Sequence, residues 1–103
     1  MAVGMLLAGP GVTEESYKQL TETMFGNFPM SKEQSPDGLI IHSAGQSDQG
    51  FYVYDIWESK EHFQRFLDGQ LGPAMHKLGG ADAAEAPTPQ FFGIDTLVWG
   101  RSS

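Results

Sequence analysis

Four short apolar runs alternate with two segments of helical periodicity, in the order strand, helix, strand, strand, helix, strand. Residues 2–8 alternate larger apolar with smaller side chains before the sequence GPG, which predicts a first strand. Residues 39–44 (LIIHSA) and 51–57 (FYVYDIW) are rich in β-branched and aromatic residues, and the GQSDQG that joins them is typical of a hairpin loop. Residues 91–99 (FFGIDTLVW) are predicted to form the fourth strand.

The first helix is predicted to begin after Thr13, a favourable N-cap residue, and to end at Gly26. Tyr17, Leu20 and Met24 recur at helical spacing and form its apolar stripe.

The second helix is predicted to begin after Ser59 and to end where Gly72 and Pro73 interrupt it, with a short turn through AMHKL completing the unit. Its apolar stripe consists of Phe63, Phe66, Leu67 and Leu71. The segment 79–90 combines Gly, Ala and Pro without periodicity, which predicts a loop.

This order on one antiparallel sheet predicts an α+β, ferredoxin-like βαββαβ fold, with right-handed crossovers that place both helices on one face. The predicted strands are apolar on both faces, whereas an antiparallel sheet with one face in water normally alternates apolar and polar residues. Two helices cover only one face. We therefore expect a second copy of the chain to cover the other face, which makes the protein a homodimer.

Composition limits the protein to one domain, residues 1–103, with enough apolar residues (40%) for a folded core. The net charge of −7 and the scarcity of Lys and Arg argue against a nucleic-acid partner. The absence of cysteine excludes disulfides and thiolate chemistry, so the cytoplasm is the expected location. The N-terminal apolar run is too short for a membrane span and lacks the positive start of a signal peptide.

The stretches GLIIHSAG and GFYVYDIWESKEHFQRFLDGQLGPAM resemble the dimeric α+β barrel superfamily, and within it the antibiotic-biosynthesis-monooxygenase-like (ABM) group. The resemblance implies a dimeric α+β barrel with an apolar pocket between the helices and the sheet of each subunit. The superfamily includes cofactor-free oxygenases that act on polycyclic aromatic or quinol substrates, heme-degrading monooxygenases, polyketide cyclases and isomerases. It therefore implies a fold more firmly than a function.

His42 and Asp55 are the candidate catalytic pair. If GQSDQG forms the hairpin loop, His42 faces Val53 and lies diagonally across from Asp55, on the same side of the sheet as Trp57. A carboxylate in that place orients the imidazole, so that His42 can act as a general base on a phenol or an activated carbon acid.

Two other readings of this pair stay open. A slip of one residue in the pairing places His42 beside Tyr52 and Tyr54 instead. The pair is also compatible with a purely structural role, as polar residues satisfied in the core or at the dimer interface.

His76 is the candidate heme ligand, on resemblance alone. The heme-degrading members have the pattern Trp-x-Ser-x-x-x-Phe, an aromatic residue three positions later, and the axial histidine ten positions beyond that. Trp57, Ser59, Phe63, Phe66 and His76 stand at those spacings.

The heme pattern is incomplete in this chain. Phe66 replaces the tryptophan that packs on the heme, an apolar residue around Leu7 replaces the asparagine that bonds oxygen, and Pro73 lies three residues before His76. The main expectation is therefore no cofactor, with heme bound through His76 as an alternative and a helix-end histidine as the structural reading.

Other cofactors and a metal ion are not expected. His62, in the first turn of the second helix and off its apolar stripe, is predicted to face solvent. The three histidines lack zinc-site spacing, and there is no dinucleotide-binding, P-loop or nucleophile-elbow motif.

An aromatic-lined pocket, with Tyr54, Trp57, Phe63 and Phe66 as its wall, suits a planar apolar ligand. The leading hypothesis is a homodimer that binds a planar aromatic or polyketide-like metabolite, as a cofactor-independent monooxygenase or an isomerase or cyclase. The alternatives are a non-catalytic binding or accessory dimer and a heme-binding protein.

Overall fold

A computed structural model describes residues 2–9, 12–79 and 88–102 of the chain. The elements follow in the order β1 (Val3–Ala8), α1 (Glu14–Phe25), the 3-10 helix η1 (Lys32–Gln34), β2 (Leu39–Ser47), β3 (Gly50–Trp57), α2 (Lys60–Phe66), the π-helix η2 (Leu67–Leu71), α3 (Gly72–Gly79) and β4 (Gln90–Gly93).

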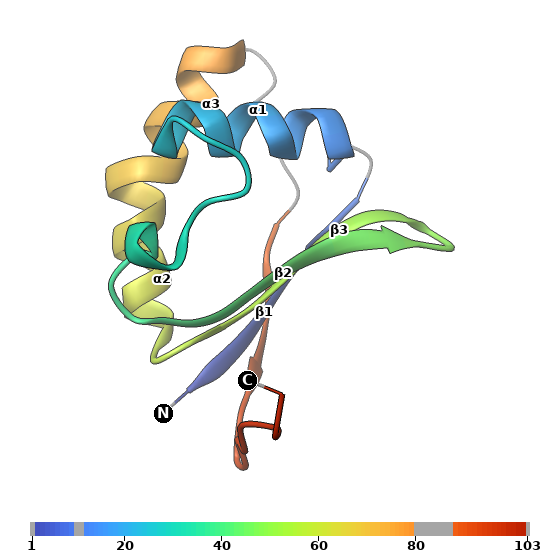
Figure 1. Ribbon diagram of the computed structural model, residues 1–103, viewed down its shortest axis with the longest axis vertical. Coiled ribbons are helices and arrows are strands. Elements are labelled where there is room, and N and C mark those ends of the chain that lie inside the picture. The colour runs from blue at the N-terminus through green and yellow to red at the C-terminus, as the bar shows by residue number, and fades with distance from the viewer. Residues whose placement is uncertain (1, 10–11, 80–87, 103) are drawn as a thin grey trace.

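The four strands form one sheet in the order β2-β3-β1-β4, with antiparallel neighbours throughout. Figure 1 shows α1 and the α2–α3 segment on the same side of this sheet, while no helix covers the other side within the described residues. This arrangement confirms the predicted α+β, ferredoxin-like fold.

The ends of α1 lie where local sequence rules place them. The Thr13 hydroxyl accepts a hydrogen bond from the Ser16 backbone N–H at 3.0 Å, and the Ser16 hydroxyl accepts one from the Thr13 backbone N–H at 3.1 Å. Gly26 ends the helix in the left-handed conformation, φ +80°, which a glycine adopts without steric cost. The predicted start and end of this helix are thus confirmed.

The second helical segment is longer than the sequence predicts. Ser59 caps α2 as expected, but Gly72 and Pro73 do not interrupt the helix, because η2 leads directly into α3. The N–H of Gly72 bonds to the Leu67 carbonyl, five residues back, so the backbone widens just before the proline. Pro73 follows directly after this widened turn, where the regular helical hydrogen-bond pattern is already broken, so the missing proline N–H does not end the helix.

The fourth strand is shorter than predicted. It pairs with β1 only from Gln90 to Gly93, and one more hydrogen bond, from the Ile94 N–H to the Ala2 carbonyl, continues the ladder. Because β1 itself begins at Val3, its pairing with β4 ends at this point.

The β2–β3 hairpin pairs two residues away from the predicted register. His42 lies directly opposite Asp55, not Val53, and the strands continue to Ser47 and Gly50 around a two-residue turn. A shift of two residues preserves the face on which every side chain lies. The predicted sharing of one face by His42 and Asp55 therefore agrees with this geometry, although the predicted partner of His42 was wrong.

The core lies between the helices and the sheet. Trp57 is only 1% exposed, and the buried apolar side chains of the described residues are Met5, Val53, Trp57, Phe63 and Ala74. The Trp57 ring meets the Phe63 ring edge-on at 5.6 Å, and Phe66 packs beside it at 5.5 Å. Burial of these aromatic rings is the main apolar stabilisation of the helical layer on the sheet.

The opposite face of the sheet is also apolar. Alternation along the strands places Leu6, Ile41, Tyr54 and Ile56 on this face, and Phe92 on β4 is 46% exposed. In the part of the chain that the structure describes, no helix is long and apolar enough to cross a membrane.

Candidate functional site

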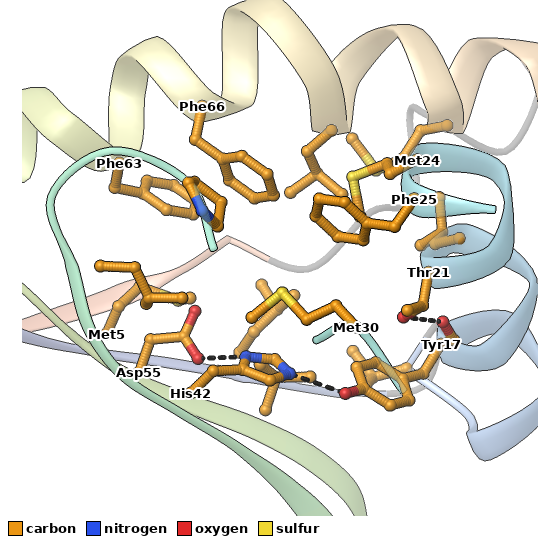
Figure 2. A pocket seen from close by; sticks show the side chains of 18 of the residues that line it. Met5, Tyr17, Thr21, Met24, Phe25, Met30, His42, Asp55, Phe63 and Phe66 are labelled. Carbon is orange, nitrogen blue, oxygen red and sulfur yellow. Dashed lines mark hydrogen bonds and ion pairs between the residues drawn. The ribbon is translucent and has the colours of Figure 1, made fainter. Parts of the chain in front are cut away.

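A cavity of about 470 Å³ lies between the helical layer and the sheet (Figure 2), a size typical of small-molecule sites. Most of its wall is apolar. Its lining includes Met5, Leu7, Leu20, Met24, Phe25, Met30, Leu39, Val53, Trp57, Phe63, Phe66, Leu71, Met75 and Leu78. The polar side chains that reach it include Tyr17, Thr21, His42 and Asp55.

Three of these polar side chains form one hydrogen-bonded chain. His42 Nδ1 lies 2.7 Å from Asp55 Oδ1, and His42 Nε2 lies 2.6 Å from the Tyr17 hydroxyl. Figure 2 shows the imidazole between the carboxylate and the phenol. Strands β2 and β3 supply the histidine and the aspartate at opposed positions, and the first turn of α1 brings Tyr17 down onto them.

Asp55 is 4% exposed, and both of its oxygens have donors nearby. The Trp57 indole N–H donates to Oδ2 at 3.3 Å, while His42 meets Oδ1. A buried carboxylate needs such partners, because an unpaired one carries a large desolvation cost. The carboxylate is therefore fixed in orientation and in turn fixes the imidazole.

The Tyr17 hydroxyl keeps its proton in this environment. Burial raises the pKa of the Tyr17 hydroxyl, the Thr21 hydroxyl lowers it in part, and the negative charge of Asp55 raises it further. Tyr17 is thus a neutral phenol at pH 7. A carboxylate oxygen only accepts, so the tautomer of His42 that suits Asp55 carries its hydrogen on Nδ1, and in this tautomer Nε2 accepts the Tyr17 O–H. This is the arrangement of a general base oriented by a carboxylate.

The sequence analysis assigned Tyr17 only to the apolar stripe of its helix, and it missed the hydrogen bond of Tyr17 to His42. The available signal was one phenolic oxygen on a stripe that otherwise carries aliphatic side chains and must face the sheet.

Three of the four predicted wall residues, Trp57, Phe63 and Phe66, line the cavity. Tyr54 does not, and its predicted place was wrong. It lies on the other face of the sheet, where its hydroxyl packs over Gly4 in space that a side chain at that position would fill. Adjacent strand residues point to opposite faces, so Tyr54 and Asp55 cannot serve the same cavity.

Neither of the other two histidines belongs to the cavity lining. His76 is exposed on α3 and is not among the residues around the cavity. A heme between helices and sheet would lack this axial ligand, and both ring nitrogens of His42 are already hydrogen-bonded. The residues present do not fit a heme in this cavity.

The prediction that His62 faces solvent was wrong. Its ring is half-buried, Nδ1 lies 2.6 Å from the Ser59 hydroxyl, and the ring fills the space beside Gly38 where a Cβ would stand. Within the described residues, no three His, Asp or Glu side chains cluster as metal ligands.

No protein-family model matches the chain, and no curated protein matches it either. Solved structures do. A candidate antibiotic biosynthesis monooxygenase from Chloroflexus aurantiacus aligns over 98% of this chain and 97% of its own, with 15% identity and a TM-score of 0.55. The heme-degrading protein Rv3592 from Mycobacterium tuberculosis, in a heme-free structure, aligns over 96% and 100%, with 17% identity and a TM-score of 0.53.

SnoaB from Streptomyces nogalater, a cofactor-independent oxygenase, aligns over 94% of each chain, with 13% identity and a TM-score of 0.50. At these identities the likeness concerns the backbone and not the chemistry. It agrees with the strand order and with the helices on one face of the sheet. The chain therefore shares the α+β, ferredoxin-like fold of these solved structures.

Proposed function

We propose that the cavity binds a planar aromatic or polyketide-like metabolite and that His42, oriented by Asp55, removes a proton from it. The observation that carries this proposal is the chain Asp55–His42–Tyr17 at the wall of a largely apolar cavity. Four of the wall residues, Met5, Met24, Met30 and Met75, are flexible thioethers that adapt well to flat aromatic rings.

Proton removal is sufficient to begin each of the reactions considered. A carbanion or phenolate formed in an apolar cavity rearranges or cyclises, or gives electrons to O₂ without a cofactor. For a methylene group, O₂ supplies one oxygen to the new carbonyl, and the other leaves as water with the two hydrogens of the methylene. The position of His76, outside the cavity lining, disfavours heme chemistry.

Removal of the base tests the proposal. Anthrone, a planar carbon acid, is incubated with the full chain in D₂O under nitrogen, and exchange of its methylene protons is followed by NMR. We expect His42→Ala to slow the protein-dependent exchange about 10²-fold or more, the usual contribution of a positioned base. His76→Ala, a matched change at an exposed histidine outside the cavity, keeps the wild-type rate.

The outcomes separate the rival functions. Anthrone that binds without enhanced exchange in the wild type indicates a non-catalytic binding protein. Equal exchange in the wild type and in His42→Ala contradicts the assignment of the base. Loss of exchange in His76→Ala alone contradicts the site.

We also propose that a second copy of the chain covers the helix-free face of the sheet. The apolar side chains on that face, together with Phe92 at 46% exposure, support this pairing. Sedimentation at micromolar concentration is expected to give twice the chain mass of 11.3 kDa, and Ile56→Lys is expected to give monomers because it buries a charge between the sheets. A wild-type monomer contradicts the pairing.

A further inference from the structure

We propose that Tyr17 is a catalytic residue of this site, whose hydroxyl contacts the substrate and relays the substrate's proton to His42. This inference rests on the proposed function. The substrate class that fits is a planar phenol or carbon acid whose acidic hydrogen reaches the Tyr17 oxygen from the cavity.

Access to the base is the first part of the argument. Both nitrogens of the His42 ring are occupied, Nδ1 by Asp55 at 2.7 Å and Nε2 by Tyr17 at 2.6 Å. A substrate therefore reaches the base either by displacing the tyrosine hydroxyl or by acting through it. The hydroxyl has one O–H, which is used on His42, and its lone pairs remain able to accept a proton.

The surroundings of Tyr17 favour action through the hydroxyl over displacement. The Tyr17 ring packs edge-on against Phe28, tilted against Phe51 and nearly parallel to His42. The ring centroids lie 5.6, 5.4 and 5.8 Å apart in that order. Its backbone lies in the first turn of α1, where the capping box of Thr13 fixes the helix start. Swinging the ring aside breaks these contacts together, whereas a relay leaves them all in place.

The relay balances in protons and charge. The substrate's O–H or C–H bond breaks as a new O–H bond forms on Tyr17 Oη, and the original Tyr17 proton moves to His42 Nε2. The products are a substrate anion and an imidazolium hydrogen-bonded to Asp55, and the step involves no oxidation or reduction. Tyr17 is a neutral phenol before and after the step, as its partly buried position requires.

Tyr17→Phe tests the relay in the same anthrone exchange experiment. The variant loses one oxygen and keeps the ring that packs on Phe28 and Phe51, so we expect it to fold. Exchange is expected to fall about 10²-fold or more, while the Kd for anthrone, followed by tryptophan fluorescence, stays within about threefold. Tyr52→Phe, the same change on the other face of the sheet, is the control that keeps the wild-type rate.

Exchange in Tyr17→Phe that equals or exceeds the wild-type rate overturns the relay, because it shows that the hydroxyl blocks His42 and that the substrate meets Nε2 directly. The failure of the underlying function looks different. If the wild type exchanges anthrone no faster than buffer, or if His42→Ala keeps the wild-type rate, the base assignment and the relay both fall.

Discussion

Replacing Trp57 by alanine is expected to lower the free energy of unfolding by about 3–5 kcal/mol, the range found when a large buried aromatic is truncated. Trp57 is 1% exposed and is the largest fully buried side chain of the described residues. Its removal opens a void between the sheet and Phe63 and Phe66, whose rings lie 5.6 and 5.5 Å away. It also removes the indole N–H that donates to the buried Asp55 carboxylate.

Urea unfolding followed by circular dichroism measures this loss, at one fixed protein concentration because the proposed dimer would gain apparent stability with concentration. Trp57→Phe separates the two causes, since it keeps most of the buried ring volume but not the N–H, and we expect it to lose less than the alanine variant. A loss below about 1 kcal/mol in Trp57→Ala contradicts the central place of this side chain in the core.

Local rules predicted the local features of this fold. The cap at Thr13 and the glycine stop at Gly26 depend on residues within one turn of the helix end, so the sequence contains the needed information. The proline rule failed at Pro73 because the π-helix before it is a feature of the whole helix and has no local signature. The predicted length of β4 was wrong for a related reason, since β4 pairs only as far as β1 extends.

The sequence predicted which side of the sheet carries the site residues, but not which of these residues are in contact. The two-residue period of a strand places His42 and Asp55 on one side in any register shifted by an even number of residues. The same period should have excluded Tyr54, which lies an odd number of positions from both Asp55 and Trp57. The contact of Tyr17 with His42 depends on how α1 packs across the β2–β3 hairpin. Helical periodicity alone does not predict this tertiary packing.

Replacing Asp55 by asparagine is expected to slow anthrone exchange by about 10²–10⁴-fold while leaving anthrone bound, because it removes the charge that stabilises imidazolium and disturbs the direction of the hydrogen bonds. The aspartate accepts from both Trp57 and His42. Asparagine has one oxygen for these two donors, so its NH₂ group must face one of them.

If the asparagine oxygen keeps the Trp57 N–H, its NH₂ faces His42 Nδ1, and that nitrogen must become an acceptor. Nε2 then carries the hydrogen and donates to the Tyr17 oxygen, so both hydrogen bonds of the His42 ring reverse. Nε2, the nitrogen that faces Tyr17, then has no lone pair to receive a proton. Nitrogen-15 NMR of the histidine ring reports this change of tautomer directly, beside the exchange rate. Asp48→Asn, the same substitution in the exposed hairpin turn, is the matched control. Exchange in Asp55→Asn within about threefold of the wild type, with the original tautomer retained, contradicts a role for the carboxylate in holding the base.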